Sequence, residues 1–248
     1  MIQADVIAAV DAPWSHEEFL ERLRAVGNKR YHDKHPFHLR MNAGTLTQSQ
    51  LQLWAVNRFY YQRCIPLKDA AILSNCPETE VRRQWRSRIV DHDGEREGEG
   101  GIEAWLRLVE AVGVPRERAL DVNSVLPGVR FAVDAYVTFA RTQPWIIAVA
   151  SSLTELFAPN LMSKRIAAFE EFYPWVESEG LRYFRSRLTQ APRDSDHALE
   201  LVYARCNTRA LQSEAVAALA FKCDVLWVQL DAIEDACRAL DQQGTVGD

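Results

Sequence analysis

Along most of the chain, apolar residues recur at intervals of three and four positions with polar residues between them. This spacing is the period of an amphipathic α-helix. The first such segment, SHEEFLERLRAVG, begins with Ser15 and Glu18 in the spacing of a capping box, which satisfies free N–H groups of the first helical turn. We expect this helix to end near Gly27, because glycine commonly follows the last helical residue.

A second capping box, formed by Thr47 and Gln50, predicts a long helix over residues 47–73. Pro66 lies inside this segment, and we expect it to kink the helix rather than end it. The same spacing predicts helices over residues 78–94, 101–113, 127–159, 161–175 and 179–190, and one or two further helices over 194–240.

Strand patterns are nearly absent from the sequence. No alternation of apolar and polar residues extends beyond a few positions, and no Asn-Gly or Asp-Gly pair lies between β-branched segments. The connections are short and are bounded by glycine or proline. We therefore predict one all-α domain, a compact bundle of about seven helices with its core over residues 15–240 and a flexible tail over 241–248.

Composition narrows the classes of partner. The chain has 248 residues, which suffices for one sizeable domain, and its net charge of -5 argues against nucleic acid, whose phosphates need a basic surface. No apolar run approaches the roughly 20 residues of a membrane span. The N-terminus carries acids and no basic leader, and the five cysteines are scattered without a CxxC pair. These features predict a cytoplasmic protein with free thiols and no membrane partner.

Candidate chemistry first appears in the helix predicted over residues 47–73. Arg58, Tyr61 and Gln62 share one face of it, and Arg88 and His92, four residues apart, share a face of a later helix. Cations, a phenol and an imidazole on otherwise apolar helices suggest an anionic, oxygen-rich ligand held inside the bundle. An unperturbed histidine has a pKa of about 6.5, which suits proton abstraction near neutral pH.

Further charged residues lie in apolar surroundings. Glu155 lies in an apolar helix, Lys222 lies in the strongly apolar stretch AVAALAFKCDVLWVQL, and Tyr183 and Arg187 share a helix face. Each of these alone is more often a surface or ion-pair residue than a ligand-binding one. Together, the basic residues exceed what Glu155 can neutralise, and they predict a pocket for a small molecule with several carboxylates. They are Arg58, Arg88, Arg165, Arg187 and Lys222.

A metal site is a weaker interpretation. His32, His35 and His38 lie close together in YHDKHPFHLR, but no HExxH motif and no glutamate-rich partner set accompanies them. The dipeptide His92-Asp93 occurs in metal phosphohydrolases, yet the other ligands of such sites are missing. We expect no bound metal. No nucleophile elbow, phosphate-binding loop or dinucleotide fingerprint is present either.

Five longer segments together are far more specific than any single motif: NKRYHDKHPFH, RFYYQRCIPLKDAAILSNCP, RIVDHDG, SSLTELFAP and YPWVESEGLRYFRSRL. Their wording resembles the pyrroloquinoline-quinone synthase family over about residues 15–240. The resemblance implies a haem-oxygenase-like bundle of seven helices that works as a homodimer. It also implies a reaction without metal or redox cofactor, in which molecular oxygen oxidises a tricarboxylated quinone precursor during ring closure. The products would be pyrroloquinoline quinone (PQQ) and hydrogen peroxide.

The resemblance also assigns roles to individual residues. It implies catalytic roles for His92, as the general base, and for Tyr183, Arg187 and His32. It implies substrate contacts for Tyr31, Arg58, Tyr61, Gln62, Arg88, Tyr136, Glu155, Arg165 and Lys222.

One position departs from the family pattern. Met162 stands where the family has a histidine that holds oxygen together with the residues matching Tyr183 and Arg187. A thioether is a weak hydrogen-bond acceptor and donates nothing. The departure therefore concerns the oxygen-holding core rather than the fold.

Three other functions share this architecture. A thiaminase-like hydrolase would need an activated cysteine, and Cys206 and Cys223 lie on predicted helices without any activating motif. A di-iron oxygenase would need several Glu and His ligands on facing helices. A helical carrier that binds the quinone and hands it on would need only the cationic pocket.

Overall fold

The structure, a computed structural model, describes residues 12–244. The expected absence of a leader and the last part of the expected tail concern residues 1–11 and 245–248, which lie outside the described residues. The α-helices are α2 (His16–Arg30), α3 (Pro36–Asn42), α4 (Gln48–Asn75), α5 (Thr79–Trp85), α6 (Ser87–Asp93), α7 (Gly100–Ala111), α8 (Arg116–Leu120), α9 (Pro127–Thr142), α10 (Trp145–Ser151), α11 (Ala158–Phe172), α12 (Arg182–Arg205) and α13 (Arg209–Gly244). Four 3-10 helices connect them: η1 (His32–Lys34), η2 (Val122–Ser124), η3 (Ser152–Phe157) and η4 (Ser178–Leu181).

The all-α prediction is confirmed, because the described residues contain helices and no strand. The predicted number of about seven helices is too low, since residues 12–244 contain twelve α-helices, although seven of these have twelve or more residues. The helix predicted over 78–94 divides into α5 and α6 at Arg86. The helix predicted over 127–159 stops at Thr142, because Pro144 has no N–H and disfavours a helical residue before it.

The two predicted helix starts have the expected geometry. Ser15 accepts a hydrogen bond from the backbone N–H of Glu18 at 3.2 Å, and the Glu18 carboxylate accepts one from the N–H of Ser15 at 3.0 Å. Thr47 and Gln50 make the same reciprocal pair at the start of α4. Pro66 does not interrupt α4, which continues to Asn75.

The predicted end of α2 near Gly27 is wrong, because the helix continues to Arg30. Gly27 serves close packing instead of capping. A Cβ atom added there would overlap the ring of Phe157, so the absence of a side chain lets η3 lie directly against α2.

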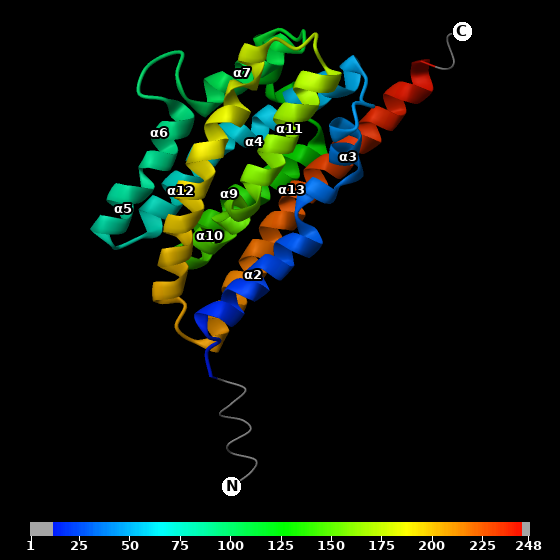
Figure 1. Ribbon diagram of the computed structural model, residues 1–248. Coiled ribbons are helices and arrows are strands. Elements are labelled where there is room, and N and C mark those ends of the chain that lie inside the picture. Colours follow the sequence, from blue (N-terminus) through cyan, green and yellow to red (C-terminus); the bar gives the residue numbers. More distant parts are fainter. Residues whose placement is uncertain (1–11, 245–248) are drawn as a thin grey trace.

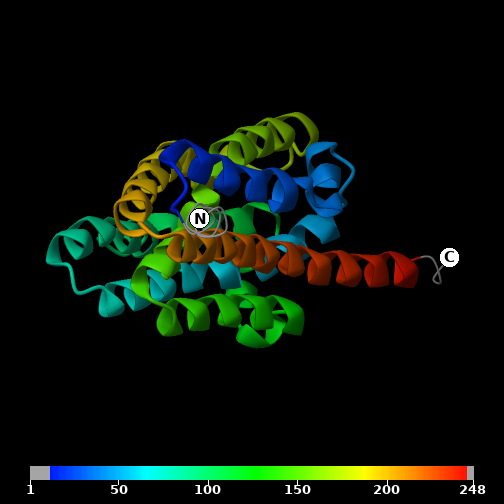
Figure 2. The ribbon, with the colours of Figure 1, turned by 90° about the horizontal axis from the view of Figure 1, so that it is seen from below.

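The bundle surrounds α4 and α13, the two longest helices (Figure 1). α4 packs on α6, α7 and α9, while α13 packs on α2, α9 and α10. Residues 241–244 of the expected tail continue α13, whose last turns project beyond the rest of the bundle (Figure 2). This arrangement leaves the middle of α4 and of α13 facing the interior of the bundle.

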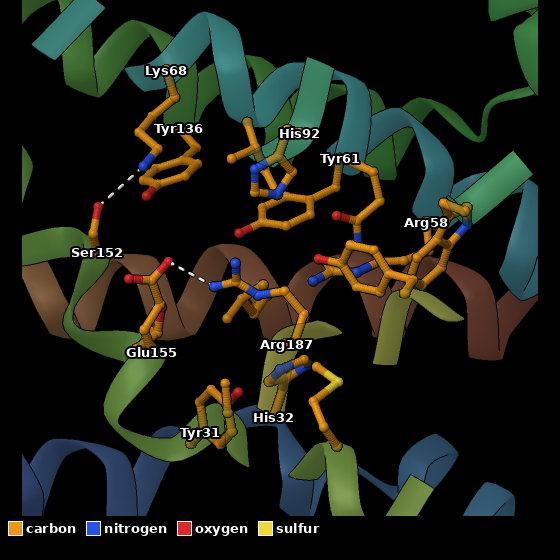
Figure 3. Close-up of a pocket in the computed structure, with 18 of the residues that line it drawn as sticks. Tyr31, His32, Arg58, Tyr61, Lys68, His92, Tyr136, Ser152, Glu155 and Arg187 are labelled. Carbon is orange, nitrogen blue, oxygen red and sulfur yellow. Dashed lines mark hydrogen bonds and ion pairs between the residues drawn. The ribbon is translucent and has the colours of Figure 1, made fainter. Parts of the chain in front are cut away.

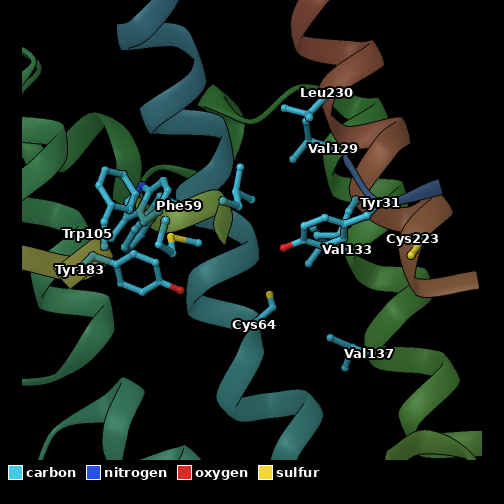
Figure 4. Packing of buried hydrophobic residues seen from close by; sticks show 14 of the residues in the cluster. Tyr31, Phe59, Cys64, Trp105, Val129, Val133, Val137, Tyr183, Cys223 and Leu230 are labelled. Carbon is cyan, nitrogen blue, oxygen red and sulfur yellow. The ribbon is translucent and has the colours of Figure 1, made fainter. Parts of the chain in front are cut away.

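A large apolar cluster fills the bundle and includes residues from Phe19 to Cys237. Trp54 and Trp105 pack with ring centroids 5.3 Å apart, and Tyr183 meets Trp105 edge-on at 5.0 Å (Figure 4). All five cysteines are buried and unbridged. The segment 145–172 is long and apolar enough to cross a membrane, but 67% of an apolar 18-residue stretch within it is buried in the bundle, as expected of core helices.

Candidate active site

A cavity lies inside the bundle where α4, α6, α11 and α12 meet η1 and η3 (Figure 3). It encloses about 660 Å³, counting its opening to solvent. Twelve of the fourteen predicted site residues line it: Tyr31, His32, Arg58, Tyr61, Gln62, His92, Tyr136, Glu155, Met162, Arg165, Tyr183 and Arg187. The other two, Arg88 and Lys222, lie directly behind lining residues and contact Glu155 and Tyr61.

His92 has the geometry of a proton acceptor. Its Nδ1 lies 3.0 Å from the carbonyl oxygen of Arg88, and because a carbonyl only accepts, Nδ1 carries the proton. Nε2 therefore has a free lone pair, and it has no hydrogen-bond partner among the described residues. Burial, and then the charge of Arg187, lower the pKa of His92 to about 4, so the expectation of an unperturbed value is wrong for the free protein.

Two glycines shape the backbone next to His92. Gly94 ends α6 with a φ of 81°, and Gly100 begins α7 with a φ of 84°, values that side chains rarely allow. A Cβ atom on Gly100 would lie too close to the carbonyl oxygen of His92 and the N–H of Gly94. The glycine-rich loop thus closes tightly behind the imidazole.

At one end of the cavity, three cations have neutral partners. Arg58 donates to the Oε1 of Gln229 at 2.8 Å, Arg165 contacts the Nε2 of His38 at 2.9 Å, and Lys222 donates to the hydroxyl of Tyr61 at 2.6 Å. No carboxylate among residues 12–244 lies within ion-pair distance of these three. Three neighbouring cations do form ion pairs with carboxylates: Lys68, Arg88 and Arg187.

Aromatic rings support these three cations from the side. The guanidinium of Arg58 lies 3.8 Å from the ring centre of Tyr61, and the ammonium of Lys222 lies 4.0 and 3.6 Å from the ring centres of Tyr61 and Tyr136. Burial and the neighbouring cations lower the pKa of Lys222 well below its usual value and that of Arg165 to about 9. An anion arriving here would relieve this repulsion.

At the other end, the cations are paired with carboxylates. Glu155 accepts from Arg88 at 2.7 Å and from Arg187 at 3.2 Å, so it joins α6 to α12 across the cavity. Asp194 lies behind, 3.5 Å from Arg187, and its backbone carbonyl accepts from Arg88. The indole of Trp85 covers Arg88, with its ring centre 3.9 Å from the guanidinium carbon. The sequence indicated Glu155 alone as a counter-charge to the basic residues, and Asp194 shares this role.

Lys68 belongs to this paired end and was not predicted. Its ammonium donates to Asp69 at 2.6 Å and to Ser152 at 3.1 Å, and all three side chains are buried. The sequence gives little sign of this, since an adjacent Lys-Asp pair is usually a surface feature. Other lining residues that the sequence did not indicate are Ile65, Trp105, Thr154, Ala158 and Leu226.

The three histidines of YHDKHPFHLR have separate surroundings. His32 lines the cavity, and burial with His38 nearby lowers its pKa well below 6.5. His35 accepts from the N–H of Phe37 at the start of α3 and contacts Asp231 at 3.0 Å, a structural role. His38 lies behind the cavity wall against Arg165. Among the described residues, no group of three or more His, Cys, Asp or Glu side chains could hold a metal ion.

The residues proposed to hold oxygen face one cavity but differ in what their side chains can donate. Met162, Tyr183 and Arg187 all line it and all are buried. Burial raises the pKa of the Tyr183 phenol, so this hydroxyl keeps its proton at neutral pH. Arg187 and Tyr183 can therefore both donate hydrogen bonds, and Met162 cannot.

The chain is similar to known proteins along most of its length. The model of the TENA/THI-4/PQQC family matches residues 20–232. The chain is 56% identical to a pyrroloquinoline-quinone synthase from Cronobacter sakazakii over 88% of this chain and 86% of that protein. It is 54% identical to one from Pseudomonas aeruginosa over 91% of this chain and 90% of that protein.

A solved domain of unknown function from Shewanella denitrificans, described as having a haem-oxygenase-like fold, superposes with a TM-score of 0.72 at 11% identity. The superposition covers 91% of this chain and 92% of that one. It confirms the predicted fold and carries no information on function. From the family match and the two sequence relatives, the chain belongs to the TENA/THI-4/PQQC family.

Proposed function

We propose that this protein is a pyrroloquinoline-quinone synthase. It would close the ring of a tricarboxylated quinone precursor and oxidise it with molecular oxygen to PQQ, releasing hydrogen peroxide without a metal or redox cofactor. A role in PQQ biosynthesis is supported by relatives of that name at 54 and 56% identity. The observation that carries the proposal is that three cations without carboxylate partners among residues 12–244 lie in or directly behind the wall of one cavity, together with an imidazole that has a free Nε2.

Substrate binding follows from the three cations with neutral partners. Arg58, Arg165 and Lys222 lie where carboxylates of the precursor can replace their missing counter-charges. Charge-assisted hydrogen bonds to a guanidinium are directional, so they fix the orientation of the rings as well as their location.

The proton-transfer step falls to His92. Its Nε2 accepts a proton from the amine or ring carbon of the bound precursor, which permits closure and enolisation. A pKa of about 4 makes the imidazole a weak base in the free protein. Bound carboxylates add negative charge to the cavity, which raises this pKa toward the useful range.

The oxidation steps use the electron-rich quinol that closure produces. Such a quinol transfers electrons to oxygen directly, and each loss of two electrons and two protons converts one O₂ to one H₂O₂. Arg187 and Tyr183 would stabilise the negative charge that develops on the reduced oxygen. We also propose, from the family resemblance, that the protein acts as a cytoplasmic homodimer.

One observation favours a second candidate function. Met162 replaces a donor in the wall that would hold oxygen, so the protein could bind the quinone without completing its oxidation. Such a protein would be a carrier for the quinone rather than a synthase.

The test is to mix purified, metal-free protein with the ring-open precursor, first without oxygen and then with it. Absorbance follows the quinone, and a peroxide assay follows the second product. Oxygen-dependent appearance of the tricyclic quinone with peroxide supports the synthase. A tight complex that stalls before full oxidation favours the carrier, and no interaction at all overturns both.

A further inference from the structure

The three cations with neutral partners differ from the paired ones in what lies behind them. Arg58 and Arg165 are each held by a side chain that does not line the cavity, Gln229 and His38. Both supports are buried hydrogen-bond acceptors without charge. At the opposite end, the same task is performed by Glu155 and by Asp194.

We propose that Gln229 and His38 are positioning residues that orient Arg58 and Arg165 without neutralising them, and so reserve both charges for the carboxylates of the ligand. The proposal deepens the proposed function, on which it rests for the identity of the ligand. According to this proposal, side chains behind the cavity wall make the site specific for ligands with several negative charges.

Gln229 is fixed in the orientation that this role needs. Its side chain is fully buried on α13, and its Nε2 donates to the carbonyl oxygen of Val225 at 3.0 Å, one turn earlier. Because a carbonyl cannot donate, the amide nitrogen must face Val225 and the amide oxygen must face Arg58. The guanidinium donates one hydrogen bond at 2.8 Å to a neutral acceptor and keeps its full charge.

His38 is fixed in the same way. Its Nδ1 lies 2.9 Å from the carbonyl oxygen of His32 and must donate to it, which leaves the Nε2 lone pair facing Arg165. Burial, then the nearby charges of Arg165 and Arg58, lower the pKa of His38 well below 6.5, so the ring stays neutral. His38 therefore acts as a second uncharged acceptor.

A carboxylate in place of either support would change the electrostatics of the cavity. An ion pair at hydrogen-bond distance in a buried site cancels most of the charge that a ligand meets. Glu155 shows this arrangement on Arg88 and Arg187, which are already satisfied in the free protein. The neutral supports, by contrast, leave the charges of Arg58 and Arg165 available to a ligand.

The decisive variant is Gln229→Glu, which has nearly the same shape and adds one negative charge against Arg58. Binding of PQQ and of benzene-1,3,5-tricarboxylate is measured by calorimetry. We expect the affinity for both to fall on the order of tenfold or more. We also expect the ligand-free Tm to exceed that of Gln229→Met, which likewise lacks the hydrogen bond to Val225, because the new carboxylate relieves the repulsion among Arg58, Arg165 and Lys222.

Matched controls separate charge from shape. Gln229→Met removes the acceptor without adding charge, so it should lose less affinity than Gln229→Glu. Gln212→Glu adds a carboxylate to another buried position of α13, where the wild-type amide contacts the backbone of Trp14, and should leave binding unchanged. For the second support, His38→Gln keeps a neutral acceptor and should bind nearly as wild type, whereas His38→Glu should not.

Wild-type affinity in folded Gln229→Glu, or an equal loss in Gln229→Met, overturns the proposal. Both Gln229 variants lose the hydrogen bond to Val225, so a ligand-free Tm that is lower in Gln229→Glu than in Gln229→Met also overturns the proposal, and this readout needs no ligand. Failure of the synthase proposal would give a different result. The wild-type protein would bind benzene-1,3,5-tricarboxylate in a Gln229-dependent manner and yet produce no quinone from the precursor.

Discussion

The two ends of the cavity contain the same kinds of side chain in opposite electrostatic conditions. Arg58, Arg165 and Lys222 are held by an amide, an imidazole and a phenol, none of which carries charge. At the other end, each cation contacts the carboxylate of an Asp or Glu: these cations are Lys68, Arg88 and Arg187. Five of the six are buried, and Arg58 is partly exposed.

The difference shows that the partner behind a buried cation decides what that cation can do. A buried charge without a counter-charge is costly, and an arriving anion relieves that cost. A buried cation that is already paired contributes oriented N–H groups and little net attraction. One end of the cavity is thus suited to bind carboxylates, and the other is suited to hold the reacting atoms beside His92.

The largest expected effect breaks the chemistry and leaves the cationic end intact. His92→Ala should lower turnover about 10²- to 10⁴-fold, because it removes the base, while the affinity for the precursor stays nearly unchanged. Single-turnover kinetics and calorimetry measure the two quantities. An equal loss of binding would contradict the assignment of His92 as the base.

The next variant removes a cation from the paired end. Arg187→Met should lower the free energy of unfolding by about 3 kcal/mol, the low end for a broken buried ion pair, because Arg88 and Arg193 still contact the abandoned carboxylates of Glu155 and Asp194. Urea unfolding measures it. Stability equal to that of the wild type would mean that this pair contributes nothing net.

The same substitution at the other end should lower the affinity for ligand and not the stability. Arg165→Met removes a buried charge that has no counter-charge, so stability should not fall. Affinity for PQQ should fall roughly 10- to 100-fold, the value of one charge-assisted hydrogen bond. A matching loss of stability in both Arg→Met variants would erase the distinction between the two ends.

Lys222 makes binding depend on pH. In the free protein, burial and then the charges of Arg58 and Lys68 lower the pKa of its ammonium well below 10.5, and a bound carboxylate should raise it. The complex therefore binds more protons than the free protein, so affinity should fall as pH rises through the lowered pKa. Calorimetry in buffers of different ionisation enthalpy detects the proton uptake, and Lys222→Met should reduce it to the share taken up by His92.

Stability depends on pH in the opposite direction to binding affinity. Because the folded pKa of Lys222 lies below its unfolded value, the unfolded chain binds more protons between the two values. The contribution of Lys222 to stability is therefore unfavourable below the folded pKa and improves as pH rises toward 10.5. Wild-type and Lys222→Met proteins should accordingly approach each other in Tm at alkaline pH.

The smallest effect on binding is expected at the oxygen-holding wall. Met162→His should change the rate of the oxygen-dependent phase and leave the affinity for PQQ nearly unaltered, since Met162 carries no charge. Stopped-flow mixing of the reduced complex with oxygen measures the rate. Identical oxidation kinetics in the two proteins would remove Met162 from the account of oxygen chemistry.

Local signals in the sequence predicted the helices well, because capping boxes and apolar spacing are local. The prediction failed at Gly27, which serves contact with Phe157, a residue far away in the chain. It failed again at Arg86, where no proline or glycine marks the division of α5 from α6. At Gly27 the cause is tertiary packing, which a single sequence does not reveal, and nothing in the structure explains the division at Arg86.

Residues that face the cavity were predictable from helix spacing and family resemblance, as with Tyr61 and Gln62. Their supports were not. Gln229 lies 171 residues from Arg58 in the chain, and its neutral amide has no pattern that marks it. Lys68 and Asp69 look like a surface pair because nothing in the sequence indicates that both are buried.

The buried cysteines have a consequence for a protein that would release hydrogen peroxide. Peroxide oxidises the thiolate form of cysteine, not the protonated thiol. Burial raises the pKa of Cys64 and Cys206 to about 11 and that of Cys223 and Cys237 to about 12. These four thiols therefore stay protonated at neutral pH and resist oxidation by the proposed by-product.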